Sequence, residues 1–381
     1  MSYFDNNATT PLHPNAHEVF VKALSESWAN PSSPYRLGAQ LRASLEICRE
    51  EISSIFGVSH DEVVFTSGAT EANNSVFFAL SRSSSSSDRV LLSPFEHPSV
   101  TDAAEYWFPK RVDFLRAQPD GTICISELED YLRISTPPVL VSIMAASNES
   151  GVVQPWKEAA VICKSHGIHF HCDSTQLIGK KNVKGLSLCS SFISSAHKFG
   201  GPKGVGWLMG KCFSPFLIGG QQEKGMRGGT ENFAAVSSSH AAFLAVENSC
   251  IDTSELAAIR DRFEHQMLKL FPDLKIIGCG ARRLWNTSLM IMPDFENFRW
   301  VGKLDKLGFQ VSTGSACSTS KFGGSPLATA LNLSDIESRR LVRVSSYFSN
   351  SSADWAALLS AFDKTFMELQ EESRDSAVIS L

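Results

Sequence analysis

The sequence predicts an α/β protein with a large domain, built on a mainly parallel sheet flanked by helices, and a smaller α+β domain. Short apolar runs alternate with segments of helical periodicity through the first two thirds of the chain, as in folds built from βα units. Beyond about residue 246 the strands become fewer and the helices longer. A chain of 381 residues also exceeds one typical hydrophobic core. We therefore predict a large domain over residues 14–246 and a small domain made of residues 1–13 and 247–381.

The first elements follow from helical spacing and from turn residues. Apolar side chains recur at helical spacing over residues 37–55, and Gly57 supplies the stop. Residues 62–66 form a short predicted strand that runs into a second helix, which opens at Ser67-Gly-Ala-Thr and ends near Leu80. The serine-rich residues 81–88 are polar and low in complexity, which predicts a surface loop.

The middle of the chain supplies the remaining strands of the large sheet. Apolar runs predict strands at residues 90–93, 139–145, 168–172, 188–194 and 204–209, with a helix at 156–166. After residue 246 the sequence predicts a helix through Ile259 and Leu270, a strand at 275–278, an apolar run at 286–292, a helix at 300–307, and an amphipathic helix from Trp355 to Leu369. This second pattern is typical of an α+β unit.

Composition and charge exclude several classes of protein. The net charge of −5 gives no electrostatic reason to expect a nucleic-acid partner. The first residues lack a basic region followed by an apolar stretch, and no apolar run is long enough to cross a bilayer, so we expect a cytoplasmic protein without membrane contact. Nine cysteines contain no Cys-x-x-Cys pair, which disfavours a disulfide framework and a zinc site, and we expect no metal.

An acid and a lysine follow two neighbouring predicted strands. Asp173 lies in His171-Cys-Asp-Ser-Thr-Gln, and Lys198 lies in Ser194-Ser-Ala-His-Lys-Phe-Gly-Gly. Pyridoxal phosphate needs an acid against its pyridine nitrogen and a lysine that holds its aldehyde as a Schiff base. Taken alone, Asp173 is more simply a helix N-cap and Lys198 a surface lysine. The glycines after Lys198 favour the functional interpretation because they allow the backbone to approach a bulky ligand.

Three further segments contain residues that suit a catalytic site. The helix that opens at Ser67-Gly-Ala-Thr70 presents free amides that suit a phosphate, although many such turns bind nothing. His97 follows a predicted strand, where a lone histidine is more often a hydrogen-bonded structural residue than a catalyst. Cys317 is surrounded by small polar residues, which predicts an exposed and reactive thiol.

An ordered series of motifs along nearly the whole chain resembles the cysteine desulfurases of the NifS/IscS type. These belong to the class V branch of fold-type I pyridoxal phosphate enzymes. The motifs are Phe4-Asp-Asn-Asn-Ala-Thr-Thr-Pro11, Asn30-Pro-Ser-Ser33, Phe65-Thr-Ser-Gly-Ala-Thr-Glu71, Glu96-His97, Asn148-Glu-Ser-Gly-Val-Val-Gln154, Asp173-Ser-Thr-Gln176, His197-Lys198, Arg227-Gly-Gly-Thr230 and Gly314-Ser-Ala-Cys317. The resemblance implies a seven-stranded sheet in the large domain and a small domain that carries the Cys317 loop.

The resemblance also implies a role for each matching residue. The catalytic residues would be Lys198, which forms the Schiff base, His97, which stacks on the ring and assists proton transfer, and Cys317, which forms a persulfide. Asp173 would bind the pyridine nitrogen, Gln176 the ring hydroxyl, and Asn148 the region of the ring hydroxyl and substrate carboxylate. The phosphate site would comprise Ala69, Thr70, Ser195 and His197, together with Thr230 of the other subunit.

The implied activity is conversion of L-cysteine to L-alanine, with the sulfur left as a Cys317 persulfide. The implied protein is a homodimer that passes this sulfur to an acceptor protein, such as an iron–sulfur scaffold, or to the biosynthesis of another thio-cofactor. One departure bears on the substrate. Relatives carry a carboxylate-binding arginine in this region, and by that pattern Phe348 takes its place.

Phe348 leaves several interpretations open. Another arginine, such as Arg343 or Arg36, would have to reach the substrate carboxylate, or the substrate differs, or activity is low. A class V lyase or aminotransferase with a different substrate is therefore the alternative function. A binding protein without catalytic activity is least favoured, because it would have no structural need for the complete set of catalytic residues.

Overall fold

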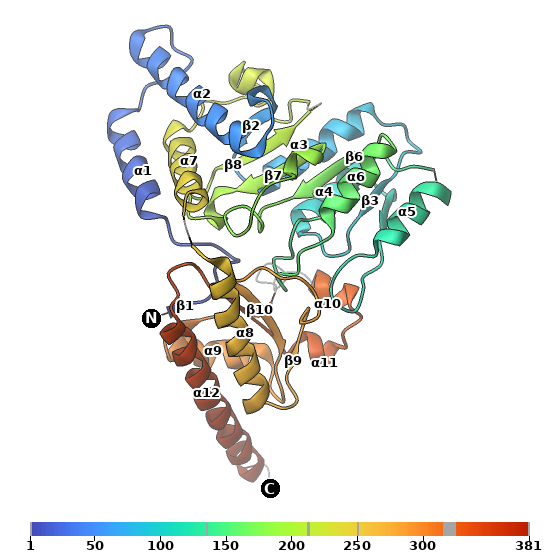
Figure 1. Cartoon of the computed structure of the whole chain (residues 1–381), viewed down its shortest axis with the longest axis vertical. Coiled ribbons are helices and arrows are strands. Elements are labelled where there is room, and N and C mark those ends of the chain that lie inside the picture. Colours follow the sequence, from blue (N-terminus) through green and yellow to red (C-terminus); the bar gives the residue numbers. More distant parts are fainter. Residues whose placement is uncertain (1, 135, 212–213, 250, 315–324, 380–381) are drawn as a thin grey trace.

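Seven strands form the large sheet of this protein. The structure is a computed structural model that describes residues 2–134, 136–211, 214–249, 251–314 and 325–379 (Figure 1). The strand order is β2-β8-β7-β6-β5-β3-β4, and β8 runs opposite to the other six strands. The predicted α/β class with a mainly parallel sheet is thus confirmed. The strand bounds are β2 (Val63–Thr66), β3 (Val90–Leu92), β4 (Val112–Phe114), β5 (Leu140–Ser142), β6 (His169–Asp173), β7 (Ser191–Ser195) and β8 (Gly206–Gly210).

Helices cover both faces of this sheet, because successive strand residues point to opposite sides. On β3, Leu91 packs in one apolar cluster while Val90 and Leu92 pack in another. The first cluster includes residues of α2 (Arg36–Phe56), α5 (Ile125–Ile134), α6 (Trp156–Ser165) and α7 (Phe233–Glu247), and the second includes residues of α3 (Ala69–Ser83) and α4 (Pro98–Trp107). Helix α1 (Pro14–Glu26) packs on the outside of α7.

The C-terminal part has its own sheet and its own apolar core, and lies below the large sheet in Figure 1. Strands β9 (Lys275–Ile276), β10 (Thr287–Ile291) and β12 (Leu341–Ser345) pair antiparallel. Helices α8 (Thr253–Leu270), α9 (Asn297–Lys306) and α12 (Ser352–Ile379) cover this sheet, and the short helices α10 (Pro326–Ala330) and α11 (Asp335–Ser338) precede β12. No helix within the described ranges is long and apolar enough to span a membrane.

The beginning of the chain joins this C-terminal part. Strand β1 (Ser2–Tyr3) pairs in parallel with β11 (Phe309–Gln310), and Phe4 is buried in the C-terminal core. These contacts involve residues 2–4, whereas the backbone N–H groups of Thr10 and His13 donate to the backbone oxygens of His197 and Gly200 beside the large sheet. The domain boundaries themselves stay a prediction.

The segments with clear periodicity were predicted well. Helix α2 ends where Gly57 adopts a left-handed φ of 69°. The predicted loop at residues 81–88 is wrong at its start, because α3 continues to Ser83. The hydroxyls of Ser81 and Ser83 bond to carbonyl groups three residues earlier in the helix, so these serines are accommodated within its last turn.

Several elements were missed. They are α1, α4, α5, α7, β1, β4, β11 and β12, together with the short helices α10 and α11. Helix α7 shows why, because it lies between α1, α2 and the sheet and is buried on most sides. Its sequence is rich in alanine and serine and lacks a polar face. A helix buried all round has no amphipathic stripe to detect.

Candidate functional site

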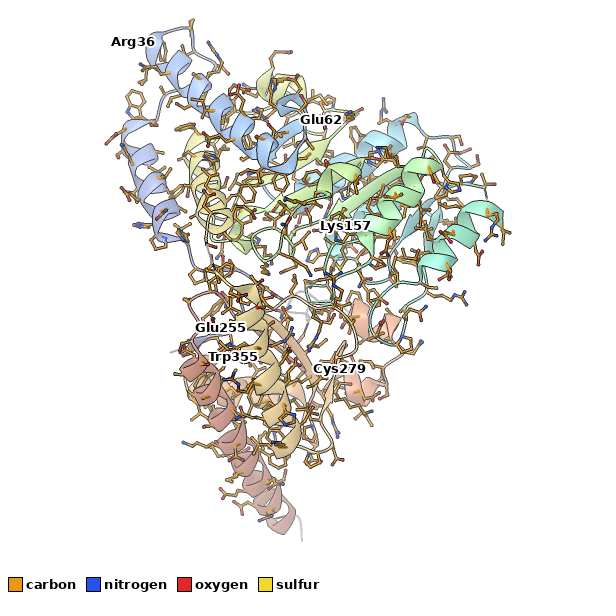
Figure 2. All side chains as sticks on the ribbon, viewed as in Figure 1. Arg36, Glu62, Lys157, Glu255, Cys279 and Trp355 are labelled. Atoms are coloured by element: carbon orange, nitrogen blue, oxygen red, sulfur yellow. The ribbon has the colours of Figure 1, made fainter. Side chains whose placement is uncertain are left out.

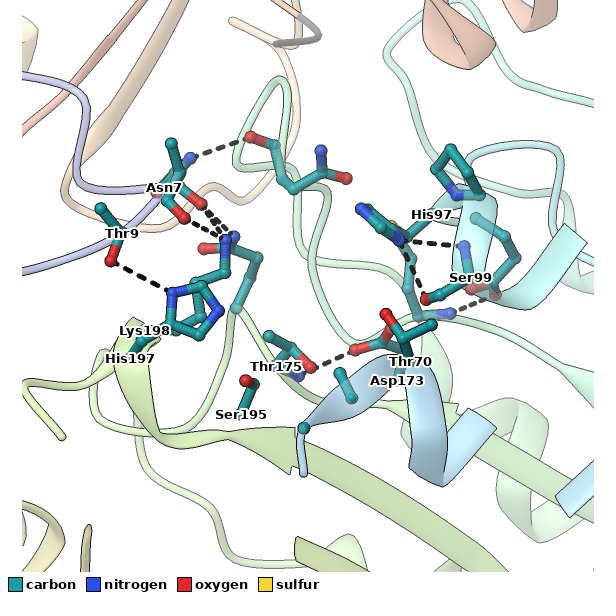
Figure 3. A pocket seen from close by; sticks show the side chains of 18 of the residues that line it. Asn7, Thr9, Thr70, His97, Ser99, Asp173, Thr175, Ser195, His197 and Lys198 are labelled. Atoms are coloured by element: carbon teal, nitrogen blue, oxygen red, sulfur yellow. Dashed lines mark hydrogen bonds between the residues drawn. The ribbon is translucent and has the colours of Figure 1, made fainter. Parts of the chain in front are cut away.

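A cavity of about 610 Å³ lies where the parallel strands of the large sheet end (Figure 3). Residues that follow β3 and β5 line it, as do the last residues of β6 and β7 and the first turn of α3. This edge is where open α/β sheets bind ligands. The lining includes these predicted site residues: Ala69, Thr70, His97, Asn148, Asp173, Gln176, Ser195, His197 and Lys198.

Asp173 and Lys198 reach the cavity from adjacent strands. Asp173 is the last residue of β6 and is 6% exposed, and its Oδ1 accepts a hydrogen bond from the backbone N–H of Thr175 at 3.0 Å. Lys198 follows β7 at the end of a single 3₁₀ turn, Ala196–Lys198. Its Nζ donates to the backbone oxygens of Asn7 and Ala8 at 2.6 and 2.7 Å. The N-terminal segment therefore holds the lysine amine in place.

A second lysine lies beside this arrangement. Lys180 is 4% exposed, and its Nζ donates to Gln176 Oε1 and, at 3.1 Å, to Asn7 Oδ1. Burial places the pKa of Lys180 well below its usual value, and the charges of Lys198 and Arg343 lower it further. Because Lys180 occupies Gln176 Oε1, the amide nitrogen of Gln176 is the group left to donate, and it bonds to Asn7 O at 3.0 Å.

His97 begins α4 and caps it. The backbone N–H of Ser99 donates to His97 Nδ1 at 3.1 Å, so a neutral ring carries its proton on Nε2. Burial lowers the pKa of His97 from its usual 6.5, and the charge of Lys198 lowers it further, while Asp173 opposes both effects. The ring is therefore neutral at physiological pH and has one nitrogen available for proton transfer.

One end of the cavity suits a phosphate group. Gly68 precedes α3 with a φ of 151°, and no side chain of the described residues caps the first turn of this helix. The amides of that turn therefore lack an internal acceptor. Thr70, Ser195 and His197 line the cavity nearby. Burial, followed by the charges of nearby lysines, lowers the pKa of His197 to about 4, so its ring is a neutral donor or acceptor at this end.

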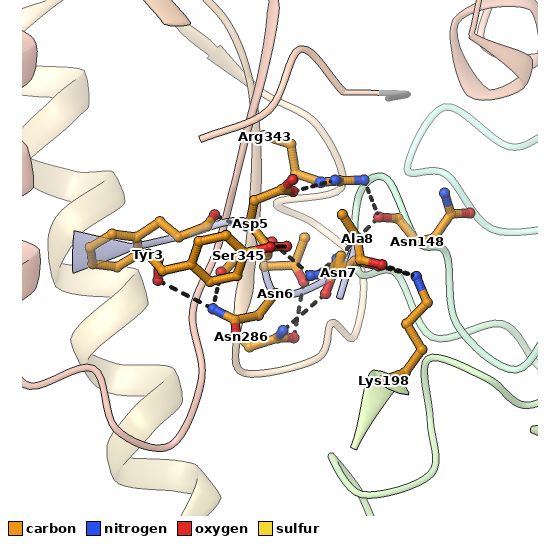
Figure 4. Close-up of polar contacts among 12 residues, drawn as sticks. Tyr3, Asp5, Asn6, Asn7, Ala8, Asn148, Lys198, Asn286, Arg343 and Ser345 are labelled. Carbon is orange, nitrogen blue, oxygen red and sulfur yellow. Dashed lines mark hydrogen bonds and ion pairs between the residues drawn. The ribbon is translucent and has the colours of Figure 1, made fainter. Parts of the chain in front are cut away.

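Arg343 brings a buried positive charge to the cavity wall. Figure 4 shows its contacts with Asp5 and Asn148. On β12, Val342 and Val344 pack into the C-terminal core, so Arg343 points to the other face of the strand. The guanidinium donates to Asp5 Oδ1 at 2.6 Å and to the backbone oxygen of Asn148 at 3.0 Å. Its buried Nε has no hydrogen-bond partner within the described residues. The two hydrogen bonds use only two of the five N–H donors of the guanidinium, so an anionic ligand in the cavity can still bind it.

Phe348 and Arg36 lie elsewhere. Phe348 packs against Trp285, with ring centroids 4.8 Å apart, and is not among the residues that line the cavity. Arg36 lies at the exposed start of α2, at the upper edge of the molecule (Figure 2). Of the arginines considered from the sequence, Arg343 is the one in the cavity wall. That Arg343 binds the substrate carboxylate in place of an arginine at position 348 stays a prediction.

Two predicted site residues are not placed in this cavity. Thr230 lines a separate cavity of about 60 Å³ together with Thr66, Arg227 and Asn232. Cys317 lies outside the described residues. Gly314 and Ser325 flank the segment that contains Cys317, and both lie close to Glu149, which lines the cavity. The Ser325 hydroxyl donates to Glu149 Oε2, and a Cβ at Gly314 would lie 3.8 Å from the same oxygen.

Several residues that organise the site were not predicted from the sequence. Asn7 accepts from Lys198, Gln176 and Lys180, and donates to the Asn148 oxygen at 3.0 Å. Asn73, one turn into α3, reaches Asp173. The spacing Gln176-Leu-Ile-Gly-Lys180 was a usable signal, because side chains four residues apart meet on one face of a helical turn. The roles of Asn7 and Asn73 depend on contacts about 100 or more residues apart in sequence.

The buried His171 on β6 predicts how the free energy of unfolding depends on pH. His171 is fully buried, and burial lowers its pKa to about 3. Between pH 6.5 and about 3 the unfolded chain binds a proton at this position and the folded chain does not, so stability falls as pH falls, by ~1.4 kcal/mol per pH unit. Denaturant titrations at pH 7 and pH 5 should show a smaller loss of unfolding free energy in His171→Gln than in the parent protein.

The exposed His166 provides the control for this measurement. His166→Gln should leave the pH dependence as it is in the parent protein. The same dependence in all three proteins would contradict the assignment of the lowered pKa to His171.

Comparison with known proteins gives a consistent result over almost the whole chain. The family model described as Aminotransferase class-V matches residues 2–358. The chain is 35% identical over 342 residues to Cysteine desulfurase IscS of Dictyoglomus turgidum, which covers 87% of this chain and 86% of that protein. It is 31% identical over 388 residues to the NifS/IcsS protein homolog of Lactobacillus delbrueckii subsp. bulgaricus, covering 97% and 98% of the two chains.

Solved structures agree with these relatives. The fold is similar to that of a NifS-like protein, with a TM-score of 0.87, 28% identity, and coverage of 96% of this chain and 99% of that chain. It is also similar to a structure described as SspA in complex with cysteine, with a TM-score of 0.79, 26% identity, and coverage of 91% and 98%.

Proposed function

Since this chain belongs to the class V aminotransferase family, we propose that it is a cysteine desulfurase that converts L-cysteine to L-alanine and retains the sulfur on Cys317. The family confirms the resemblance seen in the motifs and gives pyridoxal phosphate as the cofactor. The observation that carries the proposal is the cavity shared by Lys198, Asp173 and Arg343.

The residues present fit pyridoxal phosphate. The uncapped first turn of α3, with Thr70, Ser195 and His197, would hold the phosphate, and Asp173 would face the pyridine nitrogen. Gln176, whose amide orientation Lys180 fixes, would donate to the ring hydroxyl. Lys198 would supply the amine that binds the aldehyde. When bound, the cofactor withdraws electrons from the substrate carbon that carries the amino group.

Arg343 would bind the substrate carboxylate. Arg343 lines the cavity, and Asp5 and the Asn148 oxygen hold its guanidinium through one hydrogen each of Nη1 and Nη2, which leaves further N–H donors for a ligand. A bidentate carboxylate contact would fix the orientation of L-cysteine. Lys198 would then move the proton at the α-carbon, with the neutral His97 ring available for a second proton transfer.

Cys317 would take the sulfur. Its thiolate attacks the substrate sulfur, a sulfur–sulfur bond forms, and the carbon–sulfur bond breaks. The electron pair stays with the β-carbon, which takes up a proton and becomes the methyl group of alanine. No external oxidant is needed. Support comes from Gly314 and Ser325, which begin and end the segment containing Cys317 and lie beside the cavity-lining Glu149.

The proposal includes a homodimer and a sulfur acceptor. Thr230 lines no part of the cavity of its own chain, as expected if it serves the site of a second subunit. The persulfide sulfur would pass to an acceptor protein, an iron–sulfur scaffold or another thio-cofactor pathway. A reductant can take the place of that acceptor in an assay.

Equal release of alanine and sulfide tests the function. The purified protein, incubated with pyridoxal phosphate, L-cysteine and a thiol reductant, should release the two products in a ratio of one to one. Cys317→Ala should stop release, because no other thiol is expected to reach the substrate sulfur. Cys279→Ala, which removes an exposed cysteine, should leave release unchanged.

Two results would contradict parts of this proposal. Full sulfide release by Cys317→Ala would rule out the assigned nucleophile. Absence of alanine from a protein that binds pyridoxal phosphate would favour the alternative function, a class V lyase or aminotransferase with another substrate.

A further inference from the structure

Asn73 is a fully buried amide that connects two site residues. It lies in α3, and its Nδ2 donates to Asp173 Oδ2 at 3.3 Å and to Ser99 Oγ at 2.9 Å. Ser99 Oγ is in turn 2.9 Å from His97 Nδ1. One amide group thus contacts Asp173 directly and His97 through one hydroxyl.

A second contact fixes which way this amide faces. His171 Nε2 is 2.9 Å from Asn73 Oδ1, and the pKa of His171 of about 3 means that its ring is neutral at physiological pH. A carboxylate only accepts, so the Asn73 nitrogen must face Asp173, and its oxygen must then accept the Nε2 proton of His171. His171 Nδ1 is left to accept from Ser191 Oγ, 2.9 Å away.

The hydroxyl of Ser99 continues this chain of hydrogen bonds from Asn73 to His97. Ser99 Oγ accepts from Asn73, so its own proton is free to point at His97 Nδ1, which also accepts from the Ser99 backbone N–H. Each of the two amide hydrogens and the amide oxygen of Asn73 therefore has a defined partner. A flipped amide would place oxygen against the Asp173 carboxylate and nitrogen against the donating His171.

We propose that Asn73 is a positioning residue, held by His171, that orients the Asp173 carboxylate toward the pyridine nitrogen of the cofactor and links it to His97. Asp173 receives one donor on each oxygen, from Thr175 N and Asn73 Nδ2, so both oxygens are fixed while one side stays open to the cavity. The assignment rests on the pyridoxal phosphate site and not on the identity of the substrate.

A merely structural amide would act differently. If Asn73 only satisfied buried polar groups, its replacement would lower the stability of the protein and leave the properties of the bound cofactor unchanged. A positioning role predicts a change in the affinity for pyridoxal phosphate and in the pH titration of its visible absorbance. Glu96 and His97 also face Asp173, so these two residues must stay intact in every variant tested.

The test compares Asn73 with its neighbour Asn74. Asn74 lies in the same helix and bonds to Thr70 O and Trp107 Nε1, outside the Asp173 network. Asn73→Ala should weaken pyridoxal phosphate binding about ten- to a hundredfold, the loss typical of one hydrogen bond to a charged group. Binding is measured by titrating cofactor-free protein with pyridoxal phosphate, without substrate. Asn74→Ala should bind as the parent protein does.

Asn73→Asp gives the sharper readout. It places a second carboxylate against Asp173, and two carboxylates this close share a proton near neutral pH. The pH titration of the cofactor absorbance should therefore acquire a new protonation step, which Asn73→Ala and Asn74→Asp should lack. Cofactor affinity and titration curves that match those of the Asn74 variants would overturn the proposal.

His171→Leu keeps the proposal testable if the Asn73 variants do not fold. It removes the Nε2 donor that holds the oxygen of Asn73, without changing Asp173. A folded His171→Leu protein should bind pyridoxal phosphate more weakly than the parent, and unchanged affinity would overturn the positioning role. Because no step uses cysteine, failure of the proposed desulfurase activity would not affect this result.

Discussion

Lys198→Ala should abolish release of alanine and sulfide and remove the visible absorbance of the lysine-bound cofactor. The Nζ of Lys198 is held over the cavity by the backbone oxygens of Asn7 and Ala8, and the proposed mechanism uses it for binding the aldehyde and for moving the α-proton. Loss of a positioned acid–base group alone lowers turnover by roughly 100- to 10,000-fold. Spectra and product release are measured on the same preparation.

Two further lysine variants make this prediction specific. Lys184→Ala removes an exposed lysine from the same region and should change neither measurement. Lys180 is the competing amine, because it is buried beside Gln176 and also has a lowered pKa. If Lys198→Ala kept its absorbance and lost it only when Lys180→Met was added, the amine that binds the cofactor would be Lys180.

Arg343→Ala should lower kcat/KM for L-cysteine by about 30- to 4,000-fold, corresponding to about 2–5 kcal/mol for truncating one partner of a buried charge pair. Arg343 is 2% exposed, lines the cavity, and has an Nε without a partner in the described chain. The quantity to measure is kcat/KM, obtained from initial rates of alanine release. Cofactor affinity should change little, because the hydrogen bonds of Arg343 go to Asp5 and the Asn148 oxygen and not to Thr70, Ser195 or His197.

Controls separate this effect from lost stability. Arg343 also pairs with Asp5, so thermal unfolding of Arg343→Ala must be measured alongside its kinetics. Arg339→Ala removes a neighbouring exposed arginine and should leave kcat/KM unchanged. Phe348→Arg should not restore activity to Arg343→Ala, because Phe348 packs on Trp285. Rescue by that second change would show that position 348 reaches the substrate after all.

The large sheet was predictable because its strands and helices have clear local patterns. Strand β6 is a short apolar run, and helix α2 has an apolar stripe and a glycine stop. Strand β12 was missed although Leu341-Val-Arg-Val-Ser alternates as a strand should. Recognising that alternation would have placed Arg343 opposite the two core valines.

The candidate site was predictable in its chemistry and only partly in its geometry. Residues that follow parallel strands meet at one edge of the sheet, so Asp173 and Lys198 were expected to lie close together. Asn7 and Asn73 carry no such signal. Asparagine is common in turns and helix caps, and the functional contacts of these two residues come from segments that only the folded chain brings together.

By itself the sequence determined the fold class, the cofactor chemistry and the family, because these depend on residue types and on periodicity along the chain. Only the tertiary structure decided which arginine lines the cavity and which groups contact the Asp173 carboxylate. Both answers depend on the direction of a side chain: on β12 the packing of Val342 and Val344 turns Arg343 toward the cavity, and on α3 Asn73 contacts His171 through its oxygen and Asp173 through its nitrogen.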